Sequence, residues 1–277
     1  MELAGKTALV TGASTGIGRS IAVVLAANGA AVGLVGRSTD RLQTTREQIL
    51  REGGQSEAFS ADLSSPEAIR RMWGEVEAMW NGIDILVNAA GVWHGEDELL
   101  MGRLLHETPE AEVAEVFAVQ TLAPVLLSRL AIPWMAEHSR GKILNVSGEI
   151  ESARGWLHYY VSKKALESFT RGLAEELREY EIQVNCVSPS DTLTEAYERF
   201  FPGYSPADVL LPSDVAQLAL FLVSSRADHI TGSVTVIRSK TAHSTDKSND
   251  ALFASREVQT GRAPSQGGLA ARAIEGE

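Results

Sequence analysis

A glycine-rich turn near the start of the chain is the feature that most restricts its fold. The turn, 11–18, follows a short apolar run at 7–10 and precedes an amphipathic segment at 17–28. Gly12 permits a tight turn, and Gly16 and Gly18 let a ligand approach the backbone closely. Free amide groups and the dipole at a helix start attract an anion such as a pyrophosphate. This strand–turn–helix context predicts a dinucleotide-binding α/β fold.

The rest of the chain to residue 240 alternates short apolar runs with longer amphipathic segments. The alternation predicts βαβ units and a parallel sheet covered on both faces, which is a single Rossmann-type three-layer sandwich. The predicted strands are 7–10, 31–35, 56–60, 83–88, 142–146, 183–187 and 233–237. The predicted helices are 17–28, 40–52, 66–80, 110–136, 159–180 and 213–224.

Composition changes after residue 240, where Ser, Thr, Gly, Ala and charged residues dominate. The large apolar residues there are too few to build a core; they are Leu252, Phe253, Val258, Leu269 and Ile274. We therefore expect residues 1–240 to form one domain and 241–277 to be a polar, flexible tail, or an arm that docks on a neighbour.

Charge and cysteine content exclude several classes of function. The formal net charge of -11 repels phosphate backbones, so we expect no nucleic-acid partner. The single cysteine, Cys186, excludes an intrachain disulfide and a cysteine-based zinc site, and its apolar surroundings predict a buried structural thiol. No apolar run reaches the ~18 residues of a membrane span. The chain passes almost at once into its first predicted strand, so we expect a cytoplasmic location and no membrane partner.

Two residues on one predicted helix form an acid–base pair. Tyr159 and Lys163 are four positions apart, and so lie on the same helix face. A free tyrosine has a pKa of ~10, and a neighbouring ammonium group stabilises the phenolate and lowers that pKa. Tyr160 and Lys164 have the same spacing, which leaves the register open on spacing alone. Such a pair suits proton transfer coupled to hydride transfer.

These stretches together resemble the short-chain dehydrogenase/reductase family. The glycine turn matches its Thr-Gly-x-x-x-Gly-x-Gly pattern, and Tyr159-x-x-x-Lys163, with Ser162 before the lysine, matches its catalytic pair. Further matches are the acidic-apolar pair Asp62-Leu63, the stretch 88–91 that begins with Asn88 and ends with Gly91, and Ile230-Thr231-Gly232. The resemblance covers about 5–237 and implies a seven-stranded Rossmann sheet.

The resemblance also implies a set of cofactor contacts. The end of the second strand reads Gly36-Arg37, without the Asp that would repel a 2′-phosphate, so we expect NADP(H) rather than NAD(H). Thr15 stands where many NADP-dependent relatives carry a second basic residue. The residues expected to contact the cofactor are Gly12, Ser14, Thr15, Gly16, Ile17, Gly18, Arg37, Asp62, Leu63, Asn88, Gly91, Tyr159, Lys163, Pro189, Thr192 and Thr194.

The family's catalytic serine position is altered in this chain. The usual Asn-x-Ser-Ser run reads Asn145-Val146-Ser147-Gly148, so the expected hydroxyl position holds glycine. We expect Ser147 to polarise the substrate carbonyl if a shortened loop rotates it inward, because an extended chain would point it to the opposite side. Glu149 and Ser152 are alternative replacements, Glu149 as a protonated carboxyl or simply as a solvated loop residue.

Three further positions depart from the family pattern. Gln120 replaces the Asn that bends the long helix and holds a relay water, and we expect its longer amide to hold that water in a shifted place. Ser190 replaces the Gly after Pro189 and adds a hydroxyl near the chemistry. The usual Val-Asp-Gly-Gly at the last strand reads Val-Ile-Arg-Ser over 236–239.

An aromatic rim is predicted around the substrate cleft. Trp93, Trp156, Tyr197 and Phe200 are the residues involved, with Glu149 as a polar contact; Phe201 and Tyr204 follow in the same lid. Such a rim suits a bulky apolar substrate, although the rings could equally cap the sheet. His94 and the acidic residues after it are read as a solvated loop, with no metal site, and His158 as a helix-start residue.

The sequence therefore predicts an NADP(H)-dependent carbonyl reductase or alcohol dehydrogenase. Tyr159 would be the acid/base, Lys163 would lower its pKa and bind ribose, and Ser147 and Gln120 would assist. The alternative is a relative that keeps the nucleotide pocket without hydride transfer, as a binding or regulatory protein or a non-redox acid–base catalyst. We expect a small-molecule substrate and a homodimer or homotetramer, with the apolar side chains of Val116, Val119 and Ala123 at the helix interface.

Overall fold

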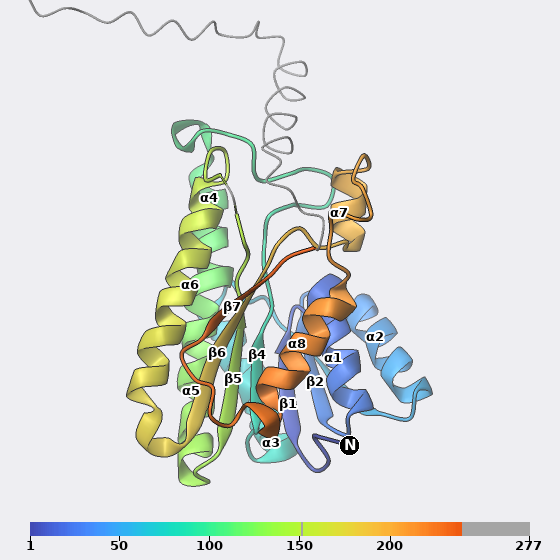
Figure 1. Ribbon diagram of the computed structural model, residues 1–277, viewed down its shortest axis with the longest axis vertical. Helices are drawn as coiled ribbons and strands as arrows, with labels where there is room; N and C mark the ends of the chain where they lie inside the picture. Colours follow the sequence, from blue (N-terminus) through green and yellow to red (C-terminus); the bar gives the residue numbers. More distant parts are fainter. Residues whose placement is uncertain (151, 240–277) are drawn as a thin grey trace, which may run out of the picture.

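The computed structural model describes residues 1–150 and 152–239. Its core is one sheet of seven parallel strands in the order β3-β2-β1-β4-β5-β6-β7 (Figure 1). The strands are β1 (Thr7–Thr11), β2 (Ala31–Gly36), β3 (Gln55–Ser60), β4 (Ile85–Asn88), β5 (Gly141–Val146), β6 (Ile182–Pro189) and β7 (Val234–Ile237). The predicted tail 241–277 lies outside the described residues.

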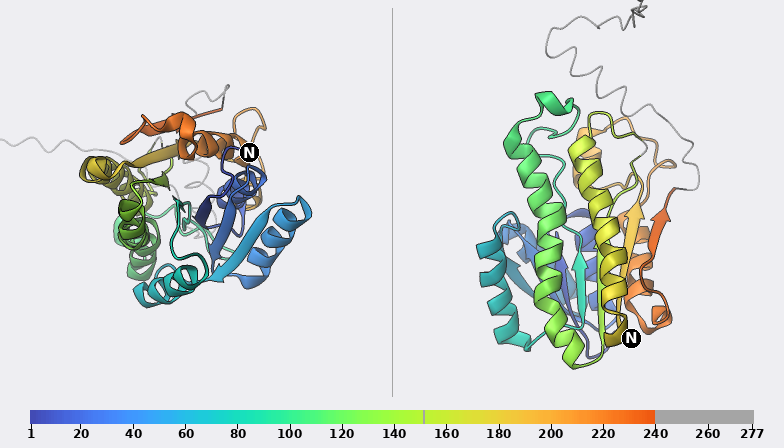
Figure 2. Two further views of the ribbon diagram at one scale, coloured as in Figure 1. Left: turned by 90° about the horizontal axis from the view of Figure 1, so that it is seen from below. Right: turned by 90° about the vertical axis from the view of Figure 1, so that its left-hand side faces the viewer.

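Helices cover both faces of the sheet and form the predicted three layers (Figure 1, Figure 2). One face is covered by α1 (Gly16–Ala27), α2 (Thr39–Arg51) and α8 (Pro212–Val223), which share one buried apolar cluster. The other face is covered by α3 (Pro66–Trp80), α4 (Glu110–Phe117), α5 (Ala123–Glu137) and α6 (Leu157–Glu176). Apolar side chains between each layer of helices and the sheet make the cores, so the Rossmann-type prediction is confirmed.

The strand order reverses direction at β1, and this reversal positions the site. From β1 the chain builds outward through β2 and β3, then returns to the other side with β4. Where neighbouring crossovers diverge in this way, a crevice opens at the carboxyl ends of the strands. The loops after β1, β4, β5 and β6 all emerge at this edge, beside the short helix α7 (Glu195–Phe200), which was not predicted (Figure 1).

The long predicted helix 110–136 is interrupted. Between α4 and α5 lies a π-helical segment, Ala118–Leu122, with Gln120 at its centre. A π segment inserts one extra residue per turn and is frequent at functional sites. The helix is therefore interrupted at Gln120, the position where the resemblance places a residue that bends the helix.

The prediction that three residues of the segment from α4 to α5 lie at an oligomer interface is wrong. Val116, Val119 and Ala123 were expected at an oligomer interface, but they are 0%, 7% and 1% exposed inside the monomer. They point toward the sheet and the loop after β4, where apolar contacts are available. The exposed apolar residues on these helices are instead Leu122, Leu157 and Val161.

Two smaller features bear on the sequence predictions. Glu110–Glu137, which spans α4 and α5, is apolar and long enough to cross a membrane, but such a signal is weak, and its packing on the sheet is that of a core helix. Cys186 is buried in β6, and burial raises the pKa of its thiol to about 12. That thiol is therefore protonated and part of the core, as predicted.

Candidate active site

The glycine turn after β1 is packed against the loop after β4. Gly12 has a φ of 68°, and a Cβ there would lie 2.9 Å from the Cα of Ala90. A Cβ on Gly18 would lie 2.3 Å from the carbonyl oxygen of Gly12. The Thr11 hydroxyl accepts hydrogen bonds from the amides of Ala89 and Ala90 at 3.0 and 3.1 Å. Only glycine fits these two positions, and the two loops form one rigid backbone surface.

The N-terminus of α1 holds an anionic group of the chain itself. The amide of Gly16 donates to Glu195 Oε2 at 3.0 Å, and Arg19 Nη1 lies 2.6 Å from Glu195 Oε1. Thr15 is the residue before the helix, and its side chain forms no cap. A site that accepts a carboxylate has the donors and dipole that a pyrophosphate requires. The residues present therefore fit a dinucleotide, and Glu195 stands near its predicted phosphates.

Arg37 and Asp62 lie close together beyond the ends of β2 and β3. The Arg37 side chain is 62% exposed, and its Nη1 lies 3.1 Å from Glu115 on α4. Hydrogen bonds from Ser64 lower the pKa of Asp62, and the charge of Arg37 acts in the same direction. Leu63 is buried beside them in the apolar core. The predicted adenosine-end residues are thus assembled, with Glu115 as the present partner of the guanidinium group.

Asn88 connects the cofactor end to the chemical end. Its side-chain amide donates to Asn145 on β5 at 2.9 Å, and Asn145 donates to Thr170 on α6. The other polar atom of Asn88, Oδ1, is buried without a hydrogen-bond partner in the described part of the chain. An acceptor left free in this way is available to a ligand at the end of β4.

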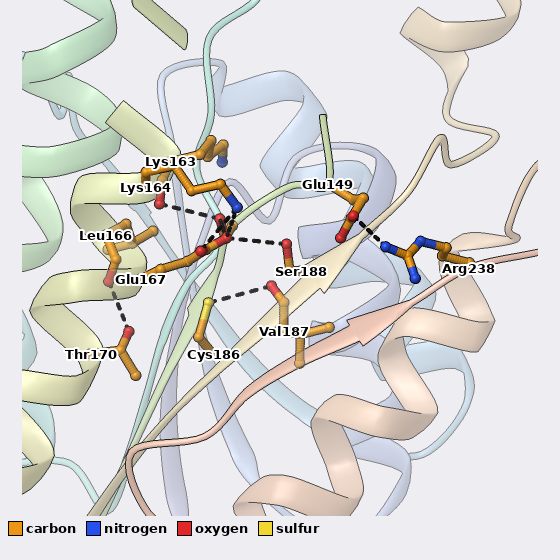
Figure 3. A network of polar contacts seen from close by, with 11 residues as sticks. Glu149, Lys163, Lys164, Leu166, Glu167, Thr170, Cys186, Val187, Ser188 and Arg238 are labelled. Atoms are coloured by element: carbon orange, nitrogen blue, oxygen red, sulfur yellow. Dashed lines mark hydrogen bonds and ion pairs between the residues drawn. The ribbon is translucent and has the colours of Figure 1, made fainter. Parts of the chain in front are cut away.

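Tyr159 and Lys163 face the ends of the strands from α6. The Lys163 ammonium donates to the carbonyl of Val146 at 3.1 Å and lies 5.4 Å from the centre of the Tyr159 ring. Burial lowers the pKa of Lys163 to about 8. In the alternative pair, the Lys164 ammonium binds the carboxylate of Glu167 on the same helix (Figure 3), and the Lys164 side chain is 41% exposed, whereas Lys163 is buried. The geometry favours the first register.

The pKa of Tyr159 is raised in this structure, whereas the sequence predicted that Lys163 would lower it. Burial raises this pKa, and the negative charge of Asp191 raises it further. Lys163 is held by Val146, so its charge does not reverse these effects. In this geometry the phenol is protonated at neutral pH, which suits a proton donor more than a base.

Gly148, and not Ser147, faces the phenol. A Cβ on Gly148 would lie 3.5 Å from the Tyr159 hydroxyl. The Ser147 hydroxyl instead donates to Glu167 at 2.9 Å and to the Lys163 carbonyl at 3.3 Å. The expected inward rotation of Ser147 is wrong for this structure, since its amide remains bonded to Val187 and fixes the strand direction.

Glu149, an alternative replacement for the family's catalytic serine, is engaged in an ion pair. Glu149 forms an ion pair with Arg238, which follows β7 (Figure 3). Its backbone amide donates to the carbonyl of Pro189 at 2.8 Å, so the loops after β5 and β6 are joined. A carboxylate that is bound to an arginine is occupied by that contact and is a poor replacement for a hydroxyl donor. Ser152 accepts a hydrogen bond from the amide of Arg154 and is engaged in its own turn.

Gln120 projects from the π segment toward Lys163. Its Nε2 donates to the Ser162 hydroxyl at 3.0 Å, and its Oε1 is buried without a hydrogen-bond partner among the described residues. A Cβ on Gly91 would lie 3.1 Å from that Oε1 and 3.7 Å from Lys163 Nζ. The free acceptor and the ammonium thus border the same small space, which is the arrangement that the predicted water would need.

The predicted aromatic rim is assembled from three separate segments. Trp93 lies 6.5 Å from Trp156 and 5.8 Å from Phe200 between ring centres, and Trp156 lies 5.5 Å from Tyr159. Tyr197 on α7 stacks on Phe201 at 4.9 Å. The rings form a continuous cover that ends at Tyr159. No group of three metal-binding side chains is found in 1–150 or 152–239.

The loop after β6 holds the remaining predicted contacts and two residues that sequence reasoning missed. Thr192 donates to the Ser190 carbonyl, and Thr194 caps α7 by accepting from the Tyr197 amide. Asp191 and Glu195 were missed, because an acidic residue in a polar loop reads as solvated. Their only signal was position: Asp191 follows Pro189-Ser190, and Glu195 follows Thr194.

Comparisons with known proteins agree with this arrangement. A model of the family described as "short chain dehydrogenase" matches residues 6–204. The chain belongs to the short-chain dehydrogenase family. It is 33% identical to a 2,3-dihydro-2,3-dihydroxybenzoate dehydrogenase of Bacillus subtilis (strain 168), over 82% of this chain and 92% of the relative.

Other relatives extend the comparison. A 3-oxoacyl-[acyl-carrier-protein] reductase of Aquifex aeolicus (strain VF5) is 32% identical, over 84% of this chain and 96% of the relative. The crystal structure of a metagenomic short-chain oxidoreductase in complex with NADP superposes with a TM-score of 0.73, at 34% identity, over 86% of this chain and 98% of that one. The protein is thus an oxidoreductase of the short-chain type, and its fold is one that binds a nicotinamide cofactor.

Proposed function

We propose that this chain is an NADP(H)-dependent carbonyl reductase or alcohol dehydrogenase that acts on a bulky, largely apolar substrate. The observation that carries the proposal is the pairing of Tyr159 and Lys163 at the carboxyl edge of the sheet, across from the glycine turn. A protonated phenol beside an ammonium group is an acid suited to a developing alkoxide. The aromatic cover over Tyr159 supports the substrate class.

The residues of the chain divide the reaction between them. The nicotinamide, when bound, supplies the hydride for reduction or accepts it for oxidation. Tyr159 gives its hydroxyl proton to the carbonyl oxygen in reduction and, as phenolate, takes the alcohol proton in oxidation. Lys163 would bind the ribose, and its ammonium group lies 5.4 Å from the centre of the Tyr159 ring. The free oxygen of Gln120 accepts from a water that returns the proton to Lys163 and Tyr159.

NADP(H) is proposed over NAD(H) because of Arg37. Its guanidinium group stands at the end of β2 without an acidic residue in that strand end to repel a 2′-phosphate. Its present ion pair with Glu115 is largely exposed and therefore worth little. A doubly charged phosphate is a stronger partner for arginine and would displace the carboxylate.

The test has two steps with matched controls. NADPH and NADH are titrated against the purified chain, and NADPH oxidation is then followed with a panel of bulky ketones. Tyr159→Phe is expected to remove turnover and leave NADPH binding intact, whereas Tyr160→Phe, in the alternative register, keeps turnover. Turnover that survives Tyr159→Phe contradicts the mechanism. Tighter binding of NADH contradicts the role of Arg37.

A second candidate function follows from one observation. The position facing the Tyr159 hydroxyl is Gly148, so the group that would polarise a carbonyl there is missing. A relative that binds the dinucleotide without hydride transfer is consistent with that loss. NADPH binding without turnover on any carbonyl would favour this candidate, as a regulatory protein or a non-redox acid–base catalyst.

We propose a homodimer or homotetramer. The exposed apolar residues Leu122, Leu157 and Val161 lie on the outward side of the π segment and α6. Light scattering coupled to gel filtration gives the mass, and Val161→Lys is expected to weaken a dimer formed through this face. A monomeric wild-type chain contradicts the proposal.

A further inference from the structure

Asp191 is a carboxylate in the substrate region without a cationic partner. It follows Pro189 and Ser190 where the chain leaves β6, and it is exposed to solvent. One carboxylate oxygen accepts a hydrogen bond from the Tyr197 hydroxyl at 3.1 Å. No ion pair in the described part of the chain includes Asp191. Glu149, the neighbouring acid, differs because Arg238 neutralises it.

Asp191 is close enough to influence the reacting phenol. Its negative charge raises the pKa of Tyr159, in addition to the larger effect of burial. The surrounding protein raises the pKa of Asp191 itself, against the opposite effect of the Tyr197 hydrogen bond. An unpaired carboxylate beside the reaction centre is available to a positively charged group of a ligand.

The rings next to this carboxylate are of the kind that binds cations. Tyr197, its hydrogen-bond partner, lies 4.9 Å from Phe201 and 6.1 Å from Tyr204 between ring centres. Phe201 stacks on Trp93 at 6.1 Å, so the aromatic surface continues toward the reaction centre. Ammonium groups are attracted to the faces of Trp and Tyr, and more strongly where water is partly excluded.

We propose that the substrate is an alcohol or ketone that carries a positively charged ammonium group, which Asp191 and the rings around Tyr197 bind. The inference deepens the oxidoreductase proposal and rests on it for the reacting end of the substrate. The apolar body of the substrate would lie between the two ends, against Trp93 and Trp156. The formal net charge of the chain, -11, also attracts a cation.

Binding of the cation has a consequence for the chemistry. A positive charge at Asp191 cancels the charge that raises the pKa of Tyr159. The phenolate form of Tyr159 then becomes more accessible, which favours removal of a proton from an alcohol. Because such coupling is reciprocal, the phenolate in turn strengthens binding of the cation.

The experiment uses two alcohols of nearly equal shape. One is an N,N-dimethylpiperidinium ring with its hydroxyl opposite the nitrogen; the other is the dimethylcyclohexanol with carbon in place of that nitrogen. Binding to the full chain saturated with NADP⁺ is measured by calorimetry, and oxidation is followed as NADPH appears. Wild type is expected to bind the cation at least about tenfold more tightly than its neutral counterpart.

Variants assign the preference to Asp191. Asp191→Asn keeps an acceptor for Tyr197 and is expected to bring the affinity ratio of the two alcohols to about one. Glu198→Gln, which removes an exposed charge from the same short helix, keeps the preference. Failure of the cation to bind wild type, a neutral alcohol bound equally well, or a preference that survives Asp191→Asn overturns the inference.

The same data separate this inference from the proposed function. If the cation binds through Asp191 but neither alcohol nor any ketone reacts, the binding inference stands and hydride transfer fails. If both alcohols are oxidised with equal efficiency, the oxidoreductase proposal stands and the ammonium inference is wrong.

Discussion

The loop after β1 and the loops after β5 and β6 lie at the same edge of the sheet but are built differently. The first is a backbone site: Gly12 and Gly18 allow close contacts, and the amide of Gly16 is its donor. The second depends on side chains: the family pattern differs at Gly148 and Ser190, and Asp191 follows in the loop after β6. A site whose donors are backbone amides keeps its binding function as long as its glycines remain. A site whose groups are side chains can change its chemistry through single substitutions.

The largest effect should follow from breaking the backbone site. Gly18→Ala places a Cβ 2.3 Å from the Gly12 carbonyl oxygen, so the turn must open. We expect NADPH affinity to fall by about 100-fold, as displacement of phosphate-binding amides by an ångström can cost this much. Calorimetry measures the loss. Gly74→Ala in α3 is the control, because nothing lies within 4 Å of its new Cβ; equal losses would contradict a specific role for the turn.

The second prediction restores the family's serine hydroxyl at Gly148, beside Tyr159. Gly148→Ser adds a hydroxyl next to Tyr159, and its Cβ fits at 3.5 Å. We expect kcat to rise about tenfold or more, since one donor to a developing oxyanion is worth about that amount or more, with unchanged NADPH affinity. Steady-state kinetics provide the measurement. Gly148→Ala adds the carbon without the hydroxyl, and an equal gain in both variants would contradict the explanation.

A smaller effect is expected where a side chain enters the backbone site. Glu195→Gln removes the negative charge at the start of α1 while keeping the shape of the side chain. We expect NADPH to bind about fivefold more tightly, because a charge at a helix end is worth about 1 kcal/mol, and the gain should shrink at high salt. Glu198→Gln on the same helix serves as the control. Weaker binding in Glu195→Gln would show that the carboxylate supports the site.

The smallest effect that we expect is a pH dependence of folding stability caused by His158, the residue before Tyr159. His158 is buried, its Nε2 has no hydrogen-bond partner among the described residues, and burial lowers its pKa. Glu112 raises this pKa and Arg103 lowers it, both less than burial does. The unfolded chain therefore binds the proton more readily, so stability present above about pH 6.5 is lost as pH falls.

Thermal unfolding between about pH 7.5 and 5 measures this dependence. His158→Gln is expected to flatten it, whereas His229→Gln, at an exposed position, leaves it unchanged. A slope that persists in His158→Gln would place the pH sensitivity elsewhere. Since the turn after β1 contains no buried histidine, a confirmed effect would assign the acid-sensitive part of this edge to the chemical end.

The fold could be predicted from the sequence because it depends on repeating patterns. Periodic apolar residues fix the strands and helices, and the glycine turn fixes the first crossover. The long helix was predicted as one element, 110–136, and is interrupted by a π segment around Gln120, where the family's Asn bends the helix. Elements without a pattern were missed: α7 is only six residues long, and its amphipathic character is too brief to detect.

The side-chain geometry of the site could be predicted only in part. Sequence spacing brings Tyr159 and Lys163 together but cannot show that Ser147 finds a stronger partner in the buried Glu167. Nor can it show that Val116, Val119 and Ala123 are used by the monomer core. Asp191 depends on where a loop turns after β6, which is decided by tertiary contacts with Tyr197 and Leu210.

The short helix α7 contributes both to the dinucleotide site and to the aromatic rim of the substrate site. Its first residue, Glu195, lies on the amide of Gly16, and Tyr197 and Phe200 of the same helix belong to the aromatic rim. A dinucleotide that takes the place of the Glu195 carboxylate removes the contact that holds the start of this helix on α1, and the rim lies on the same helix. The chain should therefore follow a compulsory order of addition, dinucleotide first, and product-inhibition patterns in which NADP⁺ competes with NADPH but not with the carbonyl compound would reveal it.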